Sequence, residues 1–268
     1  MKISRLQILT WDGATDKHGS PRSHILQVKE LLDAGADWIQ LRQKNGTDEQ
    51  KIKVAIEAVK LCKAYNATII INDCPKICLE SGADGVHLGL SDCSVAQARE
   101  IIGSRDREIP PISTEGVLNG GRRGGSVKMP PSRGGGMQKV PPISTEGVLN
   151  GGRRGGSVKM PPSRGGIIIG GTCNTQLQVS QRVTENCDYI GLGPYRFTGT
   201  KNNLNPTLGE SGVKKITDLH PPTPIIVIGG ISPSDYPTLK SLGVWGVAVS
   251  SAIVGAANIK EAYKEFVM

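Results

Sequence analysis

The sequence predicts a parallel α/β fold, and more specifically a single (β/α)8 barrel. Short apolar segments alternate with helical patterns, and the strand-like segments are apolar at successive positions, so both of their faces must be covered. Eight such units fit into about 210 of the 268 residues. A doubly wound sheet is the alternative. That fold favours fewer strands with glycines after the first, whereas here the glycines follow the seventh, at 229–230.

Four of the eight predicted strands share one pattern, in which a turn that ends a helix runs directly into a short buried strand. These segments are GADWIQLR (35–42), GADGVHLG (82–89), NCDYIGLG (186–193) and GVWGVAVS (243–250). The other four predicted strands are LQILT (6–10), ATIIIND (67–73), IIIGGT (167–172) and PIIVIGG (224–230).

The clearest helix is expected over 48–65, where apolar residues recur at helical spacing between Ile52 and Cys62. Thr47 and Gln50 have the spacing of a capping box at its start. Weaker patterns fill the remaining gaps between strands, and the helices they predict lie at 24–34, 75–81, 94–102, 176–185, 210–218, 233–241 and 251–266.

Composition excludes several classes of protein. With 37% apolar and 21% charged residues, the chain supports one large domain and is unlike a disulfide scaffold, a coiled coil or collagen. Its longest apolar runs, such as 225–231, are far shorter than the ~20 residues of a membrane helix, and we expect no signal segment. Six cysteines without a CxxC pair indicate reduced thiols and a cytoplasmic location.

Residues 110–166 form a basic block unlike the rest of the chain. Residues 110–135 read PPISTEGVLNGGRRGGSVKMPPSRGG, and 141–166 repeat those letters without a change. The block holds nine Lys and Arg residues against two acids, which accounts for nearly all of the net charge of +8. It also holds 15 of the 35 glycines. Perfect identity without apolar periodicity argues against a stacked structural repeat.

We expect this block to be a flexible insertion between the fourth helix and the fifth strand, leaving 1–109 and 167–268 to form the barrel. Such a loop costs little closure entropy, because that term grows only logarithmically with length. Binding of nucleic acid through the GGRRGG clusters is the functional alternative. The block lacks the aromatic residues that would stack on bases, so a recent duplication without function is favoured.

Polar residues follow the predicted strands at their carboxyl ends, where the chemistry of such barrels lies. They are Gln40, Arg42 and Lys44; Asn72 and Asp73; His87, Gly89 and Asp92; Thr172 and Asn174; Gly193, Pro194, Thr198, Thr200 and Lys201; Gly229, Gly230 and Ser232; and Ser250 and Ser251.

Three sets of these residues predict sites for charged ligands. Asp73 and Asp92 end neighbouring strands and suit Mg²⁺, although each alone is also a candidate helix N-cap. Arg42 and Lys44 stand two apart, so they point to the same side and can hold a diphosphate; an exposed charge cluster is the alternative. At the seventh and eighth strands, glycines and serines favour a second phosphate site or tight turns. His87 is more typical of a packing or hydrogen-bonding residue than of a catalytic one.

Several ordered motifs give a specific resemblance. They are QLRQK (40–44), IIIND (69–73), GVHLGLSD (85–92), GLGPYRFTGTK (191–201), IGGI (228–231) and VAVSSAI (247–253). With them, the chain outside 110–166 resembles thiamine-phosphate synthase along nearly its full length. The resemblance implies a TIM barrel that joins 4-amino-2-methyl-5-(diphosphooxymethyl)pyrimidine to 4-methyl-5-(2-phosphooxyethyl)thiazole by a dissociative step. Leu90 and Asn174 depart from the family pattern, which commonly has Gln and His there.

The resemblance also implies residue roles. The pyrimidine diphosphate would be held by Gln40, Arg42, Lys44 and Asn72, with Thr172 on the pyrimidine. Arg42, Lys44 and Lys201 would act on the departing diphosphate, and Asp73 and Asp92 would bind Mg²⁺. The thiazole phosphate would be held by Thr198, Thr200, Gly230, Ser250 and Ser251.

Three alternatives stay open at this point. The first is a thiazole tautomerase-like isomerase on the same barrel, which would not need the diphosphate-binding residues Lys44, Asp73, Asp92 and Lys201. The second is a barrel that carries a basic nucleic-acid-binding loop, and the third is a misfolded chimera. The expected partners are two small-molecule substrates, with no membrane and no nucleic acid; a homo-oligomer is left open.

Overall fold

The computed structural model describes residues 4–103, 166–198 and 206–267. Eight parallel strands pair in chain order, and the last pairs with the first, so they close into a barrel. The strands are β1 (Leu6–Leu9), β2 (Trp38–Leu41), β3 (Thr68–Asn72), β4 (Gly85–Leu88), β5 (Ile168–Cys173), β6 (Tyr189–Leu192), β7 (Ile225–Ile228) and β8 (Gly246–Val249). The predicted (β/α)8 barrel is therefore confirmed.

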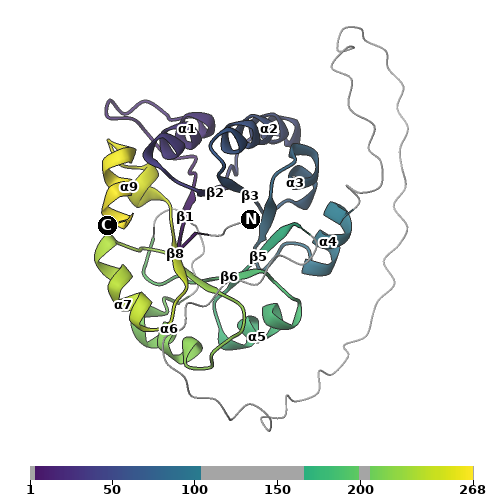
Figure 1. Ribbon diagram of the computed structural model, residues 1–268, viewed down its shortest axis with the longest axis vertical. Helices are drawn as coiled ribbons and strands as arrows, with labels where there is room; N and C mark the ends of the chain where they lie inside the picture. Colours follow the sequence, from purple (N-terminus) through teal and green to yellow (C-terminus); the bar gives the residue numbers. More distant parts are fainter. Residues whose placement is uncertain (1–3, 104–165, 199–205, 268) are drawn as a thin grey trace. The chain divides into compact units, whose positions relative to one another are not determined.

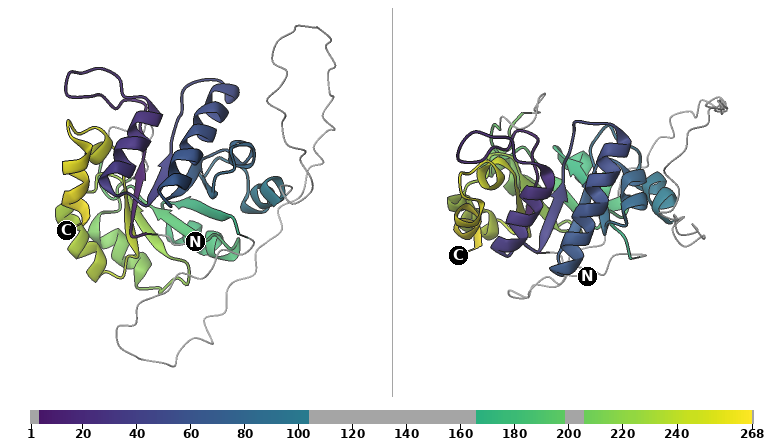
Figure 2. Two further views of the ribbon diagram at one scale, coloured as in Figure 1. Left: turned by 45° about the horizontal axis from the view of Figure 1, so that its top comes forward. Right: turned by 90° about the horizontal axis from the view of Figure 1, so that it is seen from above.

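Helices surround the strands on the outside (Figure 1). They are α1 (His24–Ala34), α2 (Asp48–Ala64), α3 (Pro75–Ser81), α4 (Val95–Gly103), α5 (Gln176–Thr184), α6 (Gly209–Thr217), η2 (Pro233–Asp235), α7 (Tyr236–Ser241), α8 (Ser251–Val254) and α9 (Ile259–Val267). The chain between β1 and α1 extends as a loop beside the C-terminal helices (Figure 2). No helix among these is long and apolar enough to span a lipid bilayer.

Apolar side chains pack on both sides of the strands, in two clusters, and this packing stabilises a barrel of short strands. The larger one lies between the strands and the helices, while the smaller takes one residue from each of seven strands and fills the barrel interior. Inside the barrel, the rings of Trp38 and Tyr189 meet edge to face with centroids 5.1 Å apart. All four residues of β1, β2, β6 and β8 are buried, as two-sided packing requires.

The predicted capping box at the start of α2 is confirmed, because the Thr47 side chain accepts from the Gln50 N–H and the Gln50 side chain accepts from the Thr47 N–H. The single helix predicted over 251–266 is wrong. The chain forms α8 and α9 with a break after Gly255, and the Asn258 side chain starts the second helix by accepting from the N–H groups of residues 260 and 261.

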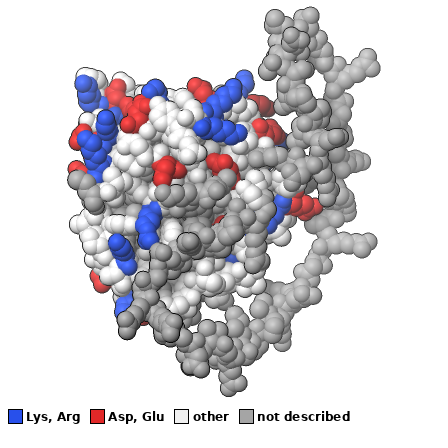
Figure 3. Space-filling view, viewed as in Figure 1, with Lys and Arg blue, Asp and Glu red and all other residues white. Residues whose placement is uncertain are grey.

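The basic block falls almost entirely outside the described residues, as do Thr200 and Lys201. The described elements before and after it are α4, which ends at Gly103, and β5, which begins at Ile168, so the chain between them connects a helix to the amino end of a strand. That end is opposite the carboxyl ends where the candidate site lies. On the face shown in Figure 3, basic and acidic side chains are interspersed over the helical shell.

Candidate active site at the barrel mouth

One cavity of about 400 Å³ opens at the carboxyl ends of the strands. Ten of the residues predicted for the site line it: Gln40, Arg42, Lys44, Asn72, Asp73, Thr172, Thr198, Gly230, Ser250 and Ser251. Asp92 stands next to this lining rather than in it, because its carboxylate is turned toward the Gly89 N–H. The β-strand register therefore gathers residues that lie up to 211 positions apart in the sequence.

The cationic end of β2 is held in place by residues that follow β1. The Arg42 N–H donates to Thr10 Oγ1 over 2.9 Å, and the Lys44 N–H donates to Asp12 Oδ2 over 3.1 Å. His24 joins these two acceptors, with Nδ1 2.8 Å from Thr10 Oγ1 and Nε2 3.2 Å from Asp12 Oδ1. Burial lowers the pKa of His24 despite the Asp12 carboxylate, so the imidazole is neutral at pH 7.

The two carboxylates predicted to bind a metal converge above Gly89. A Cβ atom at Gly89 would lie 2.9 Å from Asp92 Oδ2 and 4.0 Å from Asp73 Oδ1. Burial raises the pKa of the Asp92 carboxyl and the nearby Asp73 carboxylate raises it further, against the lowering effect of the Gly89 N–H. Lys44 Nζ forms an ion pair with Asp73, which stands in a left-handed backbone conformation with φ 65°.

Neither carboxylate caps a helix. Cys74 stands at the N-cap of α3 without a side-chain bond, and the Ser94 hydroxyl accepts from the Gln97 N–H at the start of α4. Among the described residues, no group of three or more His, Cys, Asp or Glu side chains is placed to hold a metal ion. Two carboxylates suit Mg²⁺, which keeps several waters and takes oxygens from substrate phosphates. The residues present fit that ion.

An ion pair fastens the loop after β6 to the loop after β7. The Arg196 guanidinium donates to both carboxylate oxygens of Asp235 over 2.5 and 2.6 Å, and Asp235 also accepts from the Ser232 N–H and hydroxyl. The Arg196 side chain stands over Gly230, whose φ of 64° a side chain would strain. Thr198 follows on the same loop, so this ion pair sets one wall of the cavity.

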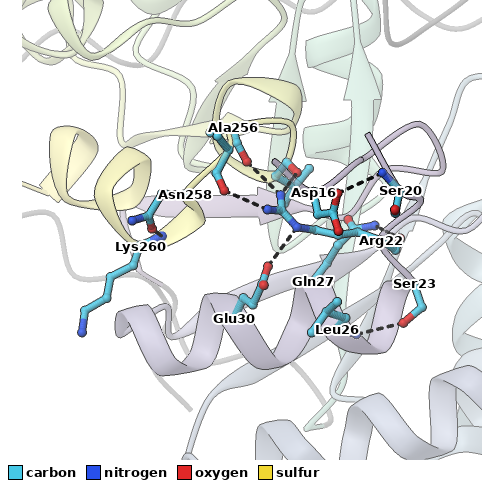
Figure 4. A network of polar contacts seen from close by, with 12 residues as sticks. Asp16, Ser20, Arg22, Ser23, Leu26, Gln27, Glu30, Ala256, Asn258 and Lys260 are labelled. Carbon is cyan, nitrogen blue, oxygen red and sulfur yellow. Dashed lines mark hydrogen bonds and ion pairs between the residues drawn. The ribbon is translucent and has the colours of Figure 1, made fainter. Parts of the chain in front are cut away.

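The start of α8 closes the opposite part of the cavity. Ser250 and Ser251 line the mouth, and the Ser250 hydroxyl donates to the Leu9 carbonyl over 3.2 Å. At the far end of α8, the buried Arg22 guanidinium donates to the carbonyls freed by the helix break, at 2.8 to 3.2 Å, and pairs with Glu30 (Figure 4). The residues that supply those carbonyls are Val254, Ala256 and Ala257. Arg22 thereby ties the loop after β1 to α8.

A chain of hydrogen bonds crosses the floor of the cavity. Gln40 Nε2 donates to Gln7 Oε1 over 3.2 Å, and Gln7 Nε2 donates to Tyr189 Oη over 3.1 Å. Tyr189 Oη lies 3.0 Å from His87 Nδ1, and His87 Nε2 lies 2.9 Å from Thr172 Oγ1. The expectation that His87 is a hydrogen-bonding residue agrees with these two contacts.

Sequence reasoning missed the residues that hold the lining in place. Asp12 and His24 belong to the loop and helix after β1, and Arg196 and Asp235 lie 39 positions apart. Gln7 gives one usable signal, because a glutamine inside an apolar strand-like segment is buried and needs a partner. The other residues carry no pattern in the sequence that marks them.

A family model described as thiamine monophosphate synthase matches residues 14–107 and 161–253 of the chain. The chain belongs to this family. The matched segments lie on both sides of most of the basic block and include nearly all of the cavity lining.

Individual relatives of the thiamine monophosphate synthase family agree with this match. The chain is 32% identical over 239 residues to a thiamine-phosphate synthase of Flavobacterium psychrophilum, covering 87% of this chain and 86% of the relative. It is 31% identical over 242 residues to one from Phocaeicola vulgatus, covering 88% and 86%. A solved thiamine phosphate pyrophosphorylase from Pyrococcus furiosus shares the fold, with a TM-score of 0.66, 21% identity, and coverage of 98% of this chain and 93% of that one.

Proposed function

We propose that this barrel mouth carries out the thiamine-phosphate synthase reaction. The substrates are 4-amino-2-methyl-5-(diphosphooxymethyl)pyrimidine and 4-methyl-5-(2-phosphooxyethyl)thiazole, and the products are thiamine phosphate and diphosphate. One observation carries the proposal: a single cavity is lined by the cationic residues after β2 and by Asp73, with Asp92 next to them, and also by the glycine and serine residues after β7 and β8. A site for two phosphorylated substrates needs both halves.

The first half holds the leaving group. Arg42 and Lys44 stand at the end of β2 and present positive charge to the diphosphate, with Lys201 as a third predicted cation. Asp73 and Asp92 would hold Mg²⁺, which when bound stabilises negative charge on the departing oxygens. Because the backbone of Arg42 and Lys44 is bonded to Thr10 and Asp12, the two cations are positioned before the substrate arrives.

The second half holds the acceptor. We assign the thiazole phosphate to Gly230, Ser250 and Ser251 with Thr198 and Thr200, and the pyrimidine ring to Gln40, Asn72 and Thr172. The C–O bond to diphosphate breaks and its electron pair leaves with the diphosphate. The lone pair of the thiazole nitrogen then forms the new C–N bond. That nitrogen has no proton to lose, so the reaction needs no general base.

The domain organisation follows from the same reasoning. We infer that 1–109 and 167–268 form the catalytic barrel, and that 110–166 is a passenger whose removal leaves the chemistry intact. The chain that follows the block enters β5 at its amino end, whereas the cavity lies at the carboxyl ends of the strands. The partners are then the two small-molecule substrates, the location is the cytoplasm, and the barrel is free to form a homo-oligomer.

The test measures diphosphate release from the pyrimidine substrate, with and without the thiazole phosphate and Mg²⁺, on the full chain and on a deletion of 110–166. Lys44→Ala removes one cation and should lower the rate about 100-fold. Lys29→Ala is the matched control, because it removes an exposed lysine paired with an aspartate on α1 and should leave the rate unchanged.

Release that depends on Mg²⁺ and thiazole phosphate in both proteins supports the synthase and the passenger block. Activity only after deletion would show that the block disrupts or regulates the barrel. No release from either folded protein would overturn the proposal and favour the tautomerase-like isomerase.

A further inference from the structure

We propose that Tyr189 and Gln7 are positioning residues that fix the amide orientation of Gln40, so that the cavity floor selects an amino group over an oxo group on the pyrimidine. This inference rests on the proposed function, because it concerns how the same site recognises its pyrimidine. The chain of hydrogen bonds from Gln40 through Gln7, Tyr189 and His87 to Thr172 is the structural basis.

The chain has one direction. The Tyr189 hydroxyl accepts from Gln7 Nε2, and we assign its single proton to the contact with His87 Nδ1, which lies 3.0 Å away. In this assignment Nδ1 accepts, so the ring proton lies on Nε2 and is donated to Thr172 Oγ1. The Thr172 hydroxyl proton is then directed away from His87, and Thr172 lines the cavity.

At the other end of this chain of hydrogen bonds, Gln40 supplies an acceptor to the cavity. Gln40 uses its Nε2 to reach Gln7, and its Oε1 has no hydrogen-bond partner among the described residues although Gln40 is only 2% exposed. A buried acceptor without a partner destabilises the folded state, and Gln40 lines the cavity, where a ligand can supply the missing donor. The floor therefore presents an acceptor at β2 and a donor at β5.

The fold makes room for this chain of hydrogen bonds and buries its centre. Tyr189 has no exposed surface and its ring packs edge to face on Trp38. Burial raises the pKa of its hydroxyl, so Tyr189 remains a neutral donor. At Gly170, a Cβ atom would lie 2.2 Å from Tyr189 Cζ and 2.6 Å from His87 Nδ1, so no side chain fits there.

An amino group on the pyrimidine ring is a donor and satisfies Gln40 Oε1, whereas an oxo group at that position brings two acceptors together. Gln40 can donate to the oxo group only if its amide turns over. Gln40 Oε1 then faces Gln7 Oε1, and two acceptors meet there instead. Gln7 in turn donates to Tyr189, so rotation of the Gln40 amide disrupts the connected hydrogen bonds and not only the bond between Gln40 and Gln7. Sites that hold a polar group in this way reject mismatched ligands by about 100-fold or more.

Tyr189→Phe tests the proposal, because it keeps the ring and removes the hydroxyl. We compare kcat/KM for the 4-amino pyrimidine diphosphate and its 4-oxo analogue, and express selectivity as their ratio, so that any intrinsic difference in reactivity cancels between proteins. The expected result is a tenfold or greater loss of selectivity in Tyr189→Phe. Tyr263→Phe is the control, since it removes a hydroxyl that donates to the Gly35 carbonyl far from the mouth, and its ratio should equal that of the wild type.

The tautomer of His87 gives a second readout that does not depend on activity. In ¹⁵N spectra of the unliganded full chain, we expect the signals of a proton on Nε2, and a mixture of tautomers in Tyr189→Phe. A proton on Nδ1 in the wild type, or unchanged selectivity in a folded Tyr189→Phe, would overturn the proposal. Absence of any synthase activity in the wild type would instead refute the proposed function, while the tautomer would still report on the direction of the chain.

Discussion

Replacing Asp235 by Asn should lower the free energy of unfolding by about 2 kcal/mol at pH 7. Burial of Asp235 by itself raises the pKa of its carboxyl, but hydrogen bonds from Arg196 and Ser232 outweigh burial and lower the pKa to about 2. Relative to a usual value of 3.8, each pKa unit corresponds to about 1.4 kcal/mol. Solvent reaches the Arg196 side chain, which is 51% exposed, and we discount the total accordingly.

The sign of the pH dependence follows from the lowered pKa. The carboxylate contributes its full stabilisation above the unfolded-state pKa of 3.8, and that stabilisation is lost as the pH falls toward about 2. The difference between wild type and Asp235→Asn should therefore be constant from pH 8 to pH 5. At pH 3 it should have fallen to about half.

The assay is urea-induced unfolding of the full chain at several pH values. Asp218→Asn is the matched control, because Asp218 forms an ion pair with Lys214 in which both side chains are more than half exposed, and its loss should cost less than about 0.5 kcal/mol. Equal costs for the two variants, or an Asp235→Asn cost that is the same at pH 7 and pH 3, would refute the reasoning.

Two further predictions concern the loop after β1. Arg22→Met should destabilise the barrel by about 3 kcal/mol, because it leaves carbonyls after α8 without their donor. Thermal unfolding should show a far smaller effect for Glu30→Gln, because the Glu30 side chain is 37% exposed. Asp12→Ala should weaken diphosphate binding about tenfold with little change in melting temperature, because the backbone N–H groups of Lys44 and Asn45 lose their acceptor. Isothermal titration calorimetry with diphosphate and Mg²⁺ measures the affinity. An unchanged affinity would contradict the positioning role of Asp12.

The barrel could be predicted because its determinants are local and repeated. Each strand combines an apolar run with a turn before it, and the capping box of α2 depends on residues three apart. The split between α8 and α9 could not be predicted from such patterns. Its freed carbonyls are satisfied by Arg22, which lies more than 230 positions away and whose partners appear only when β1 and β8 pair. Local periodicity therefore specifies an element more reliably than it specifies where the element ends.

The gathering of the candidate site was predictable for a different reason. In a parallel barrel every strand ends at the same rim, so strand assignment alone places Arg42, Asp73 and Thr172 around one cavity. Thr200 and Lys201 lie outside the described residues, and their roles stay predictions.

The orientation of each side chain at that rim is set by contacts that strand assignment does not contain. Gln40 is a cavity residue by its place on β2, but whether it offers an oxygen or an amide proton depends on Gln7 and Tyr189. Lys44 is likewise positioned through Asp12, and the loop before Thr198 through Arg196. Position at the carboxyl end of a strand thus determines which residues contact a ligand. Buried partners from neighbouring strands determine whether those residues present a hydrogen-bond donor or an acceptor to it. Substrate class follows from the first and selectivity from the second, which is why the variants proposed for selectivity fall on residues behind the lining.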